Sequence, residues 1–441
     1  MLLLFLLISA MPLVRHPLWE HFVSDLTAIK YLGLGCLACA LAHCLLTRRT
    51  PALAGSVQAL AMAALCLWAI MSGVFWGAPI AWAQSPALSY ASFLMLLVIA
   101  LGLLDSWKRL GHVLWAMIAA VAIASLYVVR EWQEFHLMYA HFRPGWVTGD
   151  PNYFTVSALV GLPLALVFCG RSQSWWKRMV ARGSALLTLA AVALAASRGG
   201  LLGLGAMGAW IAWQKRRLGV FLLLGALVTP PLLLWPRSPL NRLMHPSVSD
   251  IKSSNTRLAL WQAGMAMVEA HPLRGIGLGQ FKSEVEEYAV GHQDLDHIAH
   301  NSYLALASEL GLPALAAYLL ILGGALYTLV RFRRRALDDT AGALPPWAAD
   351  AALGLQAGLV GFSVSAFFLS AQYTKLLWFL LAVSAAVEGL LAAPAPEPVR
   401  QQELSAPPDG ELGQEAPLRG AWADIQPGGV GLALPELVAH V

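Results

Sequence analysis

The stretch from Gly183 to Trp213 reads GSALLTLAAVALAASRGGLLGLGAMGAWIAW, and it consists of two apolar runs joined by Ser197-Arg198-Gly199-Gly200. A helix needs about 20 apolar residues to cross the hydrocarbon core of a bilayer, and each run is slightly shorter than that. The stretch therefore predicts two membrane helices whose connecting turn lies at, or slightly within, a membrane face.

The rest of the chain has the same apolar character. Of its 441 residues, 58% are hydrophobic and 12% are charged, whereas soluble domains carry about 25% charged residues. The net charge of +4 does not indicate nucleic-acid binding, because the basic residues form short loop clusters without interleaved aromatic residues. Since lipid-exposed backbone must satisfy its own hydrogen bonds, the composition predicts an all-α integral membrane protein.

Apolar runs of suitable length predict about twelve transmembrane helices. The first run begins at Met1 and has neither a basic start nor a cleavage site, so we interpret it as a retained span. The predicted spans are Met1–Val14, Tyr31–Leu46, Ser56–Trp76, Pro86–Leu104, Gly111–Val129, Asn152–Cys169, Gly183–Ala196, Gly199–Trp213, Leu218–Trp235, Ser302–Val330, Ala349–Ser370 and Leu376–Leu391.

Basic residues gather in every second loop, which the positive-inside rule assigns to the cytoplasm. Both termini are then expected in the cytoplasm, and the turn at Arg198 is expected on the outer side. The five basic clusters are Arg48/Arg49, Lys108/Arg109, Arg171/Lys177/Arg178/Arg182, Lys215/Arg216/Arg217 and Arg331/Arg333/Arg334/Arg335.

The chain divides into four parts on this basis. Residues 1–235 and 302–392 are expected to hold the transmembrane helices, and residues 236–301 to form one large outer loop with short helices. Residues 393–441 are rich in Pro, Ala, Gly and Glu. Such a composition cannot bury a core, so we expect a disordered cytoplasmic tail.

Arg198 is the first candidate for a functional residue. A structural interpretation is that its side chain reaches the lipid headgroups. The alternative is that it faces a water-filled cavity and binds an anion, as arginines at membrane depth commonly do. The adjoining Gly199 and Gly200 would let backbone approach a ligand closely.

His300 begins the sequence His300-Asn301-Ser302-Tyr303-Leu304 at the junction of the outer loop and the tenth span. Gly311 and Pro313 are expected to break this long span, leaving a short helix from about Asn301 to Leu310. His300 is either an ordinary interfacial residue or a general base near neutral pH.

Arg257 is expected to start an amphipathic helix, because Leu258, Trp261 and Met265 follow it at helical spacing. It either anchors that helix at the membrane surface or pairs with phosphate. Asp150 and Pro151 have the residue types of an N-cap and first helical position for the sixth span.

A metal site is a further possibility in the outer loop. The segment His292-Gln293-Asp294-Leu295-Asp296-His297, with His300 after it, could supply ligands to a divalent ion. The spacing is not specific for coordination, so we interpret the segment as a solvated polar loop and predict no metal site.

Together these motifs resemble the O-antigen ligase family of Gram-negative bacteria, within a wider ligase/polymerase superfamily. The resemblance covers the chain from about the sixth span to the tenth. It rests on Gly149-Asp150-Pro151-Asn152, Ser197-Arg198-Gly199, Arg257 with Trp261, and His300-Asn301-Ser302-Tyr303-Leu304 followed by Glu309 and Gly311.

The resemblance implies a GT-C-like fold in the inner membrane and glycosyl transfer on its periplasmic side. The donor would be an O-antigen polysaccharide on undecaprenyl pyrophosphate, and the acceptor a sugar hydroxyl of lipid A–core oligosaccharide. Family members are regarded as inverting transferases that need neither metal nor cofactor.

The resemblance also implies roles for individual residues. His300 would deprotonate the acceptor hydroxyl. Arg198 would bind the pyrophosphate together with Arg257, or with Arg274 in place of Arg257. Supporting positions would be Asn301, Tyr303, Ser197, Asp150 and Asn152.

Other functions share parts of this pattern. An O-antigen polymerase or a protein O-oligosaccharyltransferase would use the same arginine and histidine chemistry with a different acceptor. A lipid-linked glycan transporter would instead carry repeated halves and polar residues near the bilayer midplane. We find no internal repeat, and the spans are nearly free of charge, so the sequence favours an enzyme.

Overall fold

The computed structural model describes residues 1–13, 15, 28–48, 55–77, 85–139, 142–170, 172–234, 238–246, 248–289 and 298–392. These residues lie in one compact unit, Met1–Pro394. They form helices and no strand, which confirms the predicted all-α class for the part of the chain described. The predicted disordered tail and the polar segment 292–297 fall outside the described residues.

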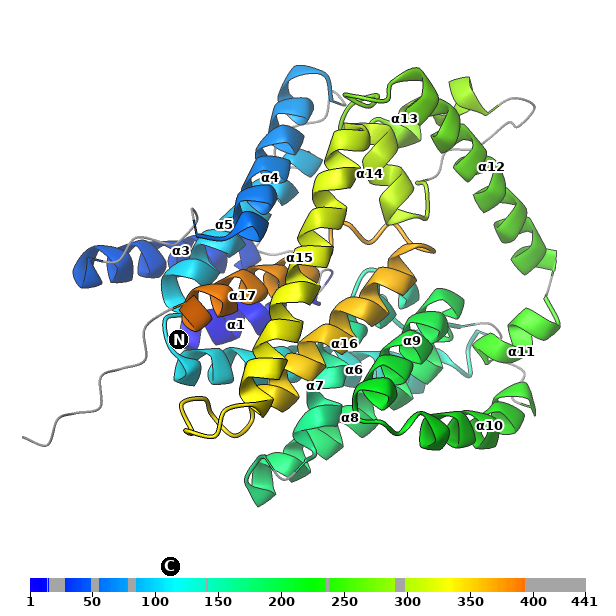
Figure 1. The fold of residues 1–441 in the computed structure, drawn as a ribbon. Helices are drawn as coiled ribbons and strands as arrows, with labels where there is room; N and C mark the ends of the chain where they lie inside the picture. The colour runs from blue at the N-terminus through cyan, green and yellow to red at the C-terminus, as the bar shows by residue number, and fades with distance from the viewer. Residues whose placement is uncertain are drawn as a thin grey trace, which may run out of the picture. The chain divides into compact units, whose positions relative to one another are not determined.

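Sixteen helices follow one another along the described residues (Figure 1). Their bounds are α1 Leu2–Ala10, α3 Ala28–Thr47, α4 Val57–Phe75, α5 Pro86–Leu103, α6 Trp107–Phe135, α7 Pro151–Phe168, α8 Trp175–Ala195, α9 Arg198–Gln214, α10 Leu218–Leu234, α11 Pro239–Met244, α12 Val248–Ala270, α13 Phe281–Tyr288, α14 Ser302–Leu310, α15 Leu312–Leu337, α16 Ala348–Ala366 and α17 Lys375–Ala392.

Nine of the described helices are long and apolar enough to cross a membrane: α3 to α8 and α15 to α17. This identifies a multi-pass membrane protein. Each of the other three predicted spans coincides with a helix, but α1 has 9 residues and α9 and α10 have 17 each. At about 1.5 Å per residue, α1 is far too short for a core of about 30 Å, so the predicted number of twelve is not confirmed.

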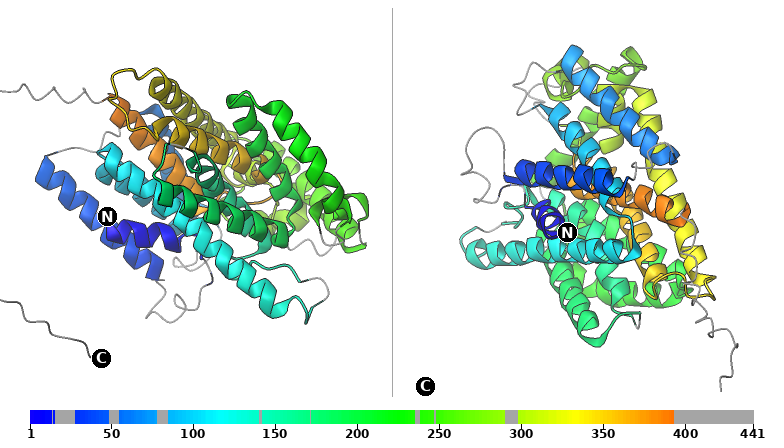
Figure 2. Two further views of the ribbon diagram at one scale, coloured as in Figure 1. Left: turned by 90° about the horizontal axis from the view of Figure 1, so that it is seen from below. Right: turned by 90° about the vertical axis from the view of Figure 1, so that its left-hand side faces the viewer.

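The centre of the bundle is formed by α7 and α16, whose apolar windows are each 72% buried, against 22% for α3. Glycines permit the close approach of these helices: a Cβ on Gly354 would lie 2.8 Å from Leu164, and one on Gly358 would lie 3.0 Å from the Val160 carbonyl oxygen. Small residues at such crossings are typical of membrane bundles. At the periphery, α1 packs between α3 and α6 (Figure 2).

Two of the basic clusters meet at one end of the bundle. Arg333 donates a hydrogen bond to Gln214 Oε1 over 3.0 Å, and Lys215 lies 3.8 Å from the carboxylate of Asp350. The clusters at residues 215–217 and 331–335, far apart in sequence, therefore share this end, in keeping with the alternation of basic clusters.

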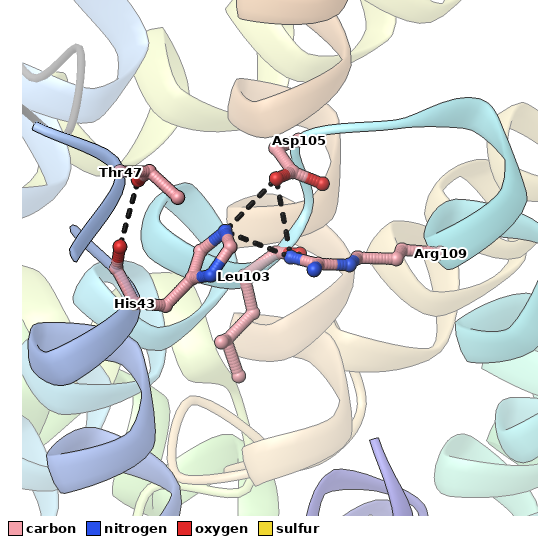
Figure 3. A network of polar contacts seen from close by, with 5 residues as sticks. All are labelled: His43, Thr47, Leu103, Asp105 and Arg109. Carbon is pink, nitrogen blue, oxygen red and sulfur yellow. Dashed lines mark hydrogen bonds and ion pairs between the residues drawn. The ribbon is translucent and has the colours of Figure 1, made fainter. Parts of the chain in front are cut away.

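A polar network joins α3 to the start of α6 (Figure 3). His43 Nε2 lies 2.9 Å from Asp105 Oδ2, and Arg109 lies 3.1 Å from the same oxygen. Burial would raise the pKa of the Asp105 carboxyl, but the hydrogen bond from His43 and the charge of Arg109 lower it overall. The network keeps Asp105 ionised between α5 and α6.

The loop between α10 and α15 folds into a helical layer. Apolar side chains of α12 pack against α13 and α14, and the buried set comprises Ala259, Leu260, Ala263, Met267, Phe281, Val285, Ala289, Ala299 and Ala305.

The expectation that Arg257 starts its helix is wrong, because α12 already begins at Val248. No proline interrupts residues 248–270, and no glycine precedes Gly264, so the helix extends through an exposed polar segment before it reaches the layer. Its packed face also differs from the predicted stripe: Leu258 is 57% exposed and Met265 is 53% exposed.

The predicted break in the tenth span is confirmed at Gly311. Helix α14 ends at Leu310 and α15 starts at Leu312. Gly311 has φ +87°, and a Cβ there would lie 2.2 Å from the Leu273 carbonyl oxygen. Only glycine fits this position without strain.

Candidate active site

The turn at Ser197 places Arg198 at the first position of α9. Helix α8 ends at Ala195, Ala196 adopts φ +47°, and the hydroxyl of Ser197 accepts a hydrogen bond from the Gly200 amide over 3.2 Å. A Cβ on Gly200 would lie 2.1 Å from Thr155, so α9 can approach α7 only because this residue is glycine.

Asp150 caps α7, as predicted. Its Oδ1 accepts hydrogen bonds from the amides of Asn152 and Tyr153 over 2.5 Å and 3.1 Å, and Pro151 occupies the first helical position. The cap places Asn152 in the first turn, where its Oδ1 accepts hydrogen bonds from Ser197 over 2.8 Å and from Arg143 over 3.2 Å. Asn152 therefore links the starts of α7 and α9 to the loop that precedes α7.

Arg143 belongs to this site, although it lies in none of the sequence motifs. Its Nε donates a hydrogen bond to the Ala195 carbonyl over 2.9 Å. The loop that carries it is shaped by Glu131, whose carboxylate accepts hydrogen bonds from the amides of Gly145, Trp146 and Val147 over 2.6 to 2.9 Å. Its sequence carries no local signal beyond a position in the loop before Asp150.

These elements enclose a cavity of about 120 Å³ whose lining includes Arg143, Arg198 and Arg257. The described lining residues carry positive charge and no acidic side chain. They are Arg143, Asn152, Val156, Ala196, Ser197, Arg198, Gly199, Gly200, Ser253, Arg257, Ser365, Phe368 and Leu369.

Arg257 reaches the cavity from α12, so the outer layer closes over the bundle at this point. Burial lowers the pKa of its guanidinium, the charge of Arg198 lowers it further, and the carboxylate of Asp150 opposes both. Its Nε is buried and has no hydrogen-bond partner among the described residues. Two arginines that repel each other around a small cavity create a site that an anion would stabilise.

His300 lies just before α14 in an unusual backbone conformation. Its φ is +50°, in the left-handed region that non-glycine residues occupy rarely and at a cost of about 1–3 kcal/mol. Asn301 then caps α14, because its Oδ1 accepts hydrogen bonds from the amides of Tyr303 and Leu304 over 3.0 Å and 3.1 Å.

His300 is not among the residues that line the cavity. Hydrogen bonds, however, connect the residues before and after it in the chain to residues near the cavity. Before it, the Ala299 carbonyl accepts a hydrogen bond from Trp261, one helical turn after Arg257, over 3.0 Å. After it, Ser302 donates a hydrogen bond to the carbonyl of Leu369, a lining residue, over 2.6 Å. Backbone strain held in place by its neighbours is common at functional sites.

Two other predicted residues lie away from the cavity lining. Arg274 is exposed in the turn after α12, so Arg257 is the one of the two that lines the cavity. Tyr303 donates a hydrogen bond from its hydroxyl to the Ser363 carbonyl over 2.9 Å, which holds α14 against α16.

Comparison with known proteins locates a family match over this region. Residues 183–319 match the family model described as O-antigen ligase. The resemblance indicated by the sequence motifs is thereby confirmed over a stretch that contains Ser197, Arg198, Arg257, Arg274 and His300. No curated protein matches the chain.

Proposed function

We propose that this protein transfers a polysaccharide from undecaprenyl pyrophosphate to a sugar hydroxyl of lipid A–core oligosaccharide. The match of residues 183–319 to the O-antigen ligase family model supports this proposal. The observation that carries the proposal is the cavity with three arginines and no acidic lining residue among those described. A diphosphate leaving group needs positive charge where its own negative charge develops.

Arg198 and Arg257 bind the diphosphate in this proposal. Guanidinium groups present planar forks of N–H donors, so each can form two charge-assisted hydrogen bonds to phosphate oxygens. They come from different helices, the start of α9 and the middle of α12. Arg143 completes the positive lining, and Asn152 orients it through the 3.2 Å hydrogen bond.

His300 acts as the general base. It removes the proton from the acceptor hydroxyl while the hydroxyl oxygen forms a bond to the anomeric carbon of the donor. The bond between that carbon and the diphosphate oxygen breaks on the opposite face, so the configuration inverts. The electron pair leaves with the diphosphate, which Arg198 and Arg257 stabilise, and the proton stays on His300.

The cavity then faces the periplasm, with both termini in the cytoplasm of a bacterial inner membrane. The positive-inside rule supports this orientation, because basic residues gather in every second loop and two of the clusters share one end of the bundle. Both substrates are membrane lipids, and a site at a bundle end lets them react without leaving the bilayer.

Transfer with purified components tests the proposal. The protein in detergent would receive lipid-linked O-polysaccharide and rough lipopolysaccharide, with and without EDTA. We expect a ladder on lipid A–core that survives EDTA and disappears in folded His300→Ala and Arg198→Ala. Elongation of lipid-linked repeats without transfer to lipid A–core would instead make the protein a polymerase. Loss with EDTA in the wild type would overturn metal-independent transfer.

A further inference from the structure

A second cavity of about 710 Å³ lies beside the first. Arg143 lines both cavities, and the two take neighbouring faces of α7: Asn152 and Val156 line the first, whereas Tyr153 and Ser157 line the second. Its other walls come from the end of α1, the loop before α7 and the start of α17. A concave site of this size is large enough for a small saccharide.

The second cavity carries positive charge from three separate elements. Arg15 follows α1, Arg143 precedes α7, and Lys375 begins α17. Asp150 also lines the cavity, but its carboxylate accepts the two amide hydrogen bonds that cap α7. The described lining therefore has a surplus of cations.

Polar groups at the start of α17 remain available to a ligand. Among the described residues, none forms a hydrogen bond or salt bridge with the ammonium group of Lys375, the first residue of α17. The adjacent Thr374 has a buried hydroxyl oxygen with no hydrogen-bond partner in the same part of the chain. Desolvated polar groups without partners are costly unless a ligand satisfies them.

Aromatic rings supply the rest of the surface. Phe142, Trp146, Tyr153 and Tyr373 line the cavity, and the guanidinium of Arg15 lies 4.5 Å from the centroid of the Trp146 ring. Aromatic side chains present flat apolar faces with polar edges, which suit the C–H faces of sugar rings. Cations next to aromatic rings match a saccharide that carries phosphate.

We propose that this second cavity binds the acceptor through a phosphate on its saccharide, with Lys375, Arg15 and Thr374 as the contacts. This inference rests on the proposed function, in which the arginines of the first cavity hold the donor diphosphate. The two substrates then meet at Arg143, the residue that the cavities share. The same phosphate chemistry could come from an ordinary anionic phospholipid, and the experiment separates these two sources.

The test compares Lys375→Met with wild type in the transfer assay, using phosphorylated and enzymatically dephosphorylated lipid A–core acceptor. We expect Lys375→Met to raise the apparent KM for the phosphorylated acceptor about tenfold or more, the loss typical of one charged hydrogen bond. The KM for the donor and for the dephosphorylated acceptor should not change. Lys282→Met, on the exposed side of α13, is the matched control. Lys375→Arg keeps the charge and should retain acceptor binding if Lys375→Met fails to fold.

A binding measurement tests the acceptor site separately from the proposed transfer activity. Wild type and Lys375→Met in nanodiscs of neutral lipid would be titrated with phosphorylated acceptor, and separately with phosphatidylglycerol. Tighter binding of the acceptor to wild type, unaffected by phosphatidylglycerol, supports the inference even if no transfer is seen. Equal acceptor binding to the two proteins overturns it while leaving the proposed function intact. Displacement of the acceptor by phosphatidylglycerol assigns the cavity to phospholipid and also overturns it.

Discussion

The hydroxyl of Ser197 donates a hydrogen bond to Oδ1 of Asn152 over 2.8 Å, and this contact joins the first turns of α9 and α7. Because Asn152 also accepts a hydrogen bond from Arg143, one amide oxygen orients two walls of the candidate cavity. The geometry of the arginines therefore depends on a residue that carries no charge.

Replacing either partner of this contact should show coupling between them. We expect Asn152→Ala and Ser197→Ala each to reduce kcat/KM for transfer. The loss of transition-state stabilisation in the double variant should be smaller than the sum of the two single losses by about 1 kcal/mol, the contribution of one neutral hydrogen bond. A double-mutant cycle on kcat/KM measures this. Asp105→Asn, in the network of Figure 3, should be additive with either change. Full additivity between Asn152→Ala and Ser197→Ala would contradict the coupling.

Arginine cannot be replaced by lysine at the cavity if each guanidinium forms two hydrogen bonds to the diphosphate. Arg198→Lys and Arg257→Lys retain the charge but lose the planar fork. We expect each to lower kcat/KM roughly 10- to 100-fold, the loss of one or two charge-assisted hydrogen bonds. Arg274→Lys is the matched control, since Arg274 is exposed outside the lining. A larger loss in Arg274→Lys than in Arg257→Lys would exchange their assigned roles.

His300 combines a proposed chemical role with a strained backbone, and two substitutions separate these properties. His300→Ala and His300→Gly both remove the base, so each should lower kcat about 100-fold or more. Glycine adopts positive φ without penalty, so the free energy of unfolding of His300→Gly should exceed that of His300→Ala by about 1 kcal/mol. His300→Gly should therefore unfold at the higher temperature. Thermal unfolding in detergent measures the difference. Activity retained by the glycine variant would show that the backbone and not the imidazole matters.

Glu131 shapes the loop that carries Arg143, although it lies outside both cavity linings. Glu131→Ala leaves three amides without their acceptor, and we expect a loss of about 1–3 kcal/mol in stability together with a higher KM for the donor. Glu134→Gln is the control on the same helix, because Glu134 is exposed and pairs with Arg130. An unchanged KM for the donor in a folded Glu131→Ala variant would show that this loop does not contribute to donor binding.

Glu309 should make stability depend on pH. It is 8% exposed on α14, and the Phe281 amide and the Tyr373 hydroxyl lie 3.4 Å and 3.5 Å from its carboxylate. Burial raises its pKa from 4.5 to about 7, against those hydrogen bonds, which lower it. The folded chain then keeps a proton that the unfolded chain releases, so stability is greatest below pH 4.5 and falls as pH rises to about 7.

Glu309→Gln removes this titration. Near pH 8, we expect its free energy of unfolding to exceed that of wild type by up to about 3 kcal/mol, and its unfolding temperature to be higher. Its unfolding temperature should also change less with pH between pH 5 and 8. Thermal unfolding as a function of pH measures both effects. A wild-type profile that keeps its slope in Glu309→Gln would assign the pH dependence to another group.

Local patterns in the sequence predicted several features of the site. The cap at Asp150, the break at Gly311 and the turn at Ser197-Arg198 each depend on residues within a few positions, so sequence spacing is enough to indicate them. The start of α12 was misplaced because residues of N-cap type recur along residues 248–257, with Asn255 and Thr256 directly before Arg257, and no glycine or proline marks a boundary there.

Arg143 was missed for a different reason. Its place in the site depends on contacts with Ala195 and Asn152 and on the loop held by Glu131. Such contacts join positions that have no periodic relationship in the chain, and nothing near Arg143 distinguishes it from the many other arginines in loops.

The sequence by itself determined that the chain is helical and membrane-embedded, where its helices break, and that its basic loops alternate. These properties follow from the hydrophobicity of each segment, from the need of backbone groups in lipid to form hydrogen bonds, and from the charge of each loop. All three depend on residues close together in the chain. Only the tertiary structure decided that Arg143, Arg198 and Arg257 line one cavity while Arg274 does not. The cavity forms where α7, α9, α12 and α16 meet. These helices meet because glycines allow close approach and because hydrogen bonds join residues far apart in the chain, and local sequence patterns indicate neither of these contacts.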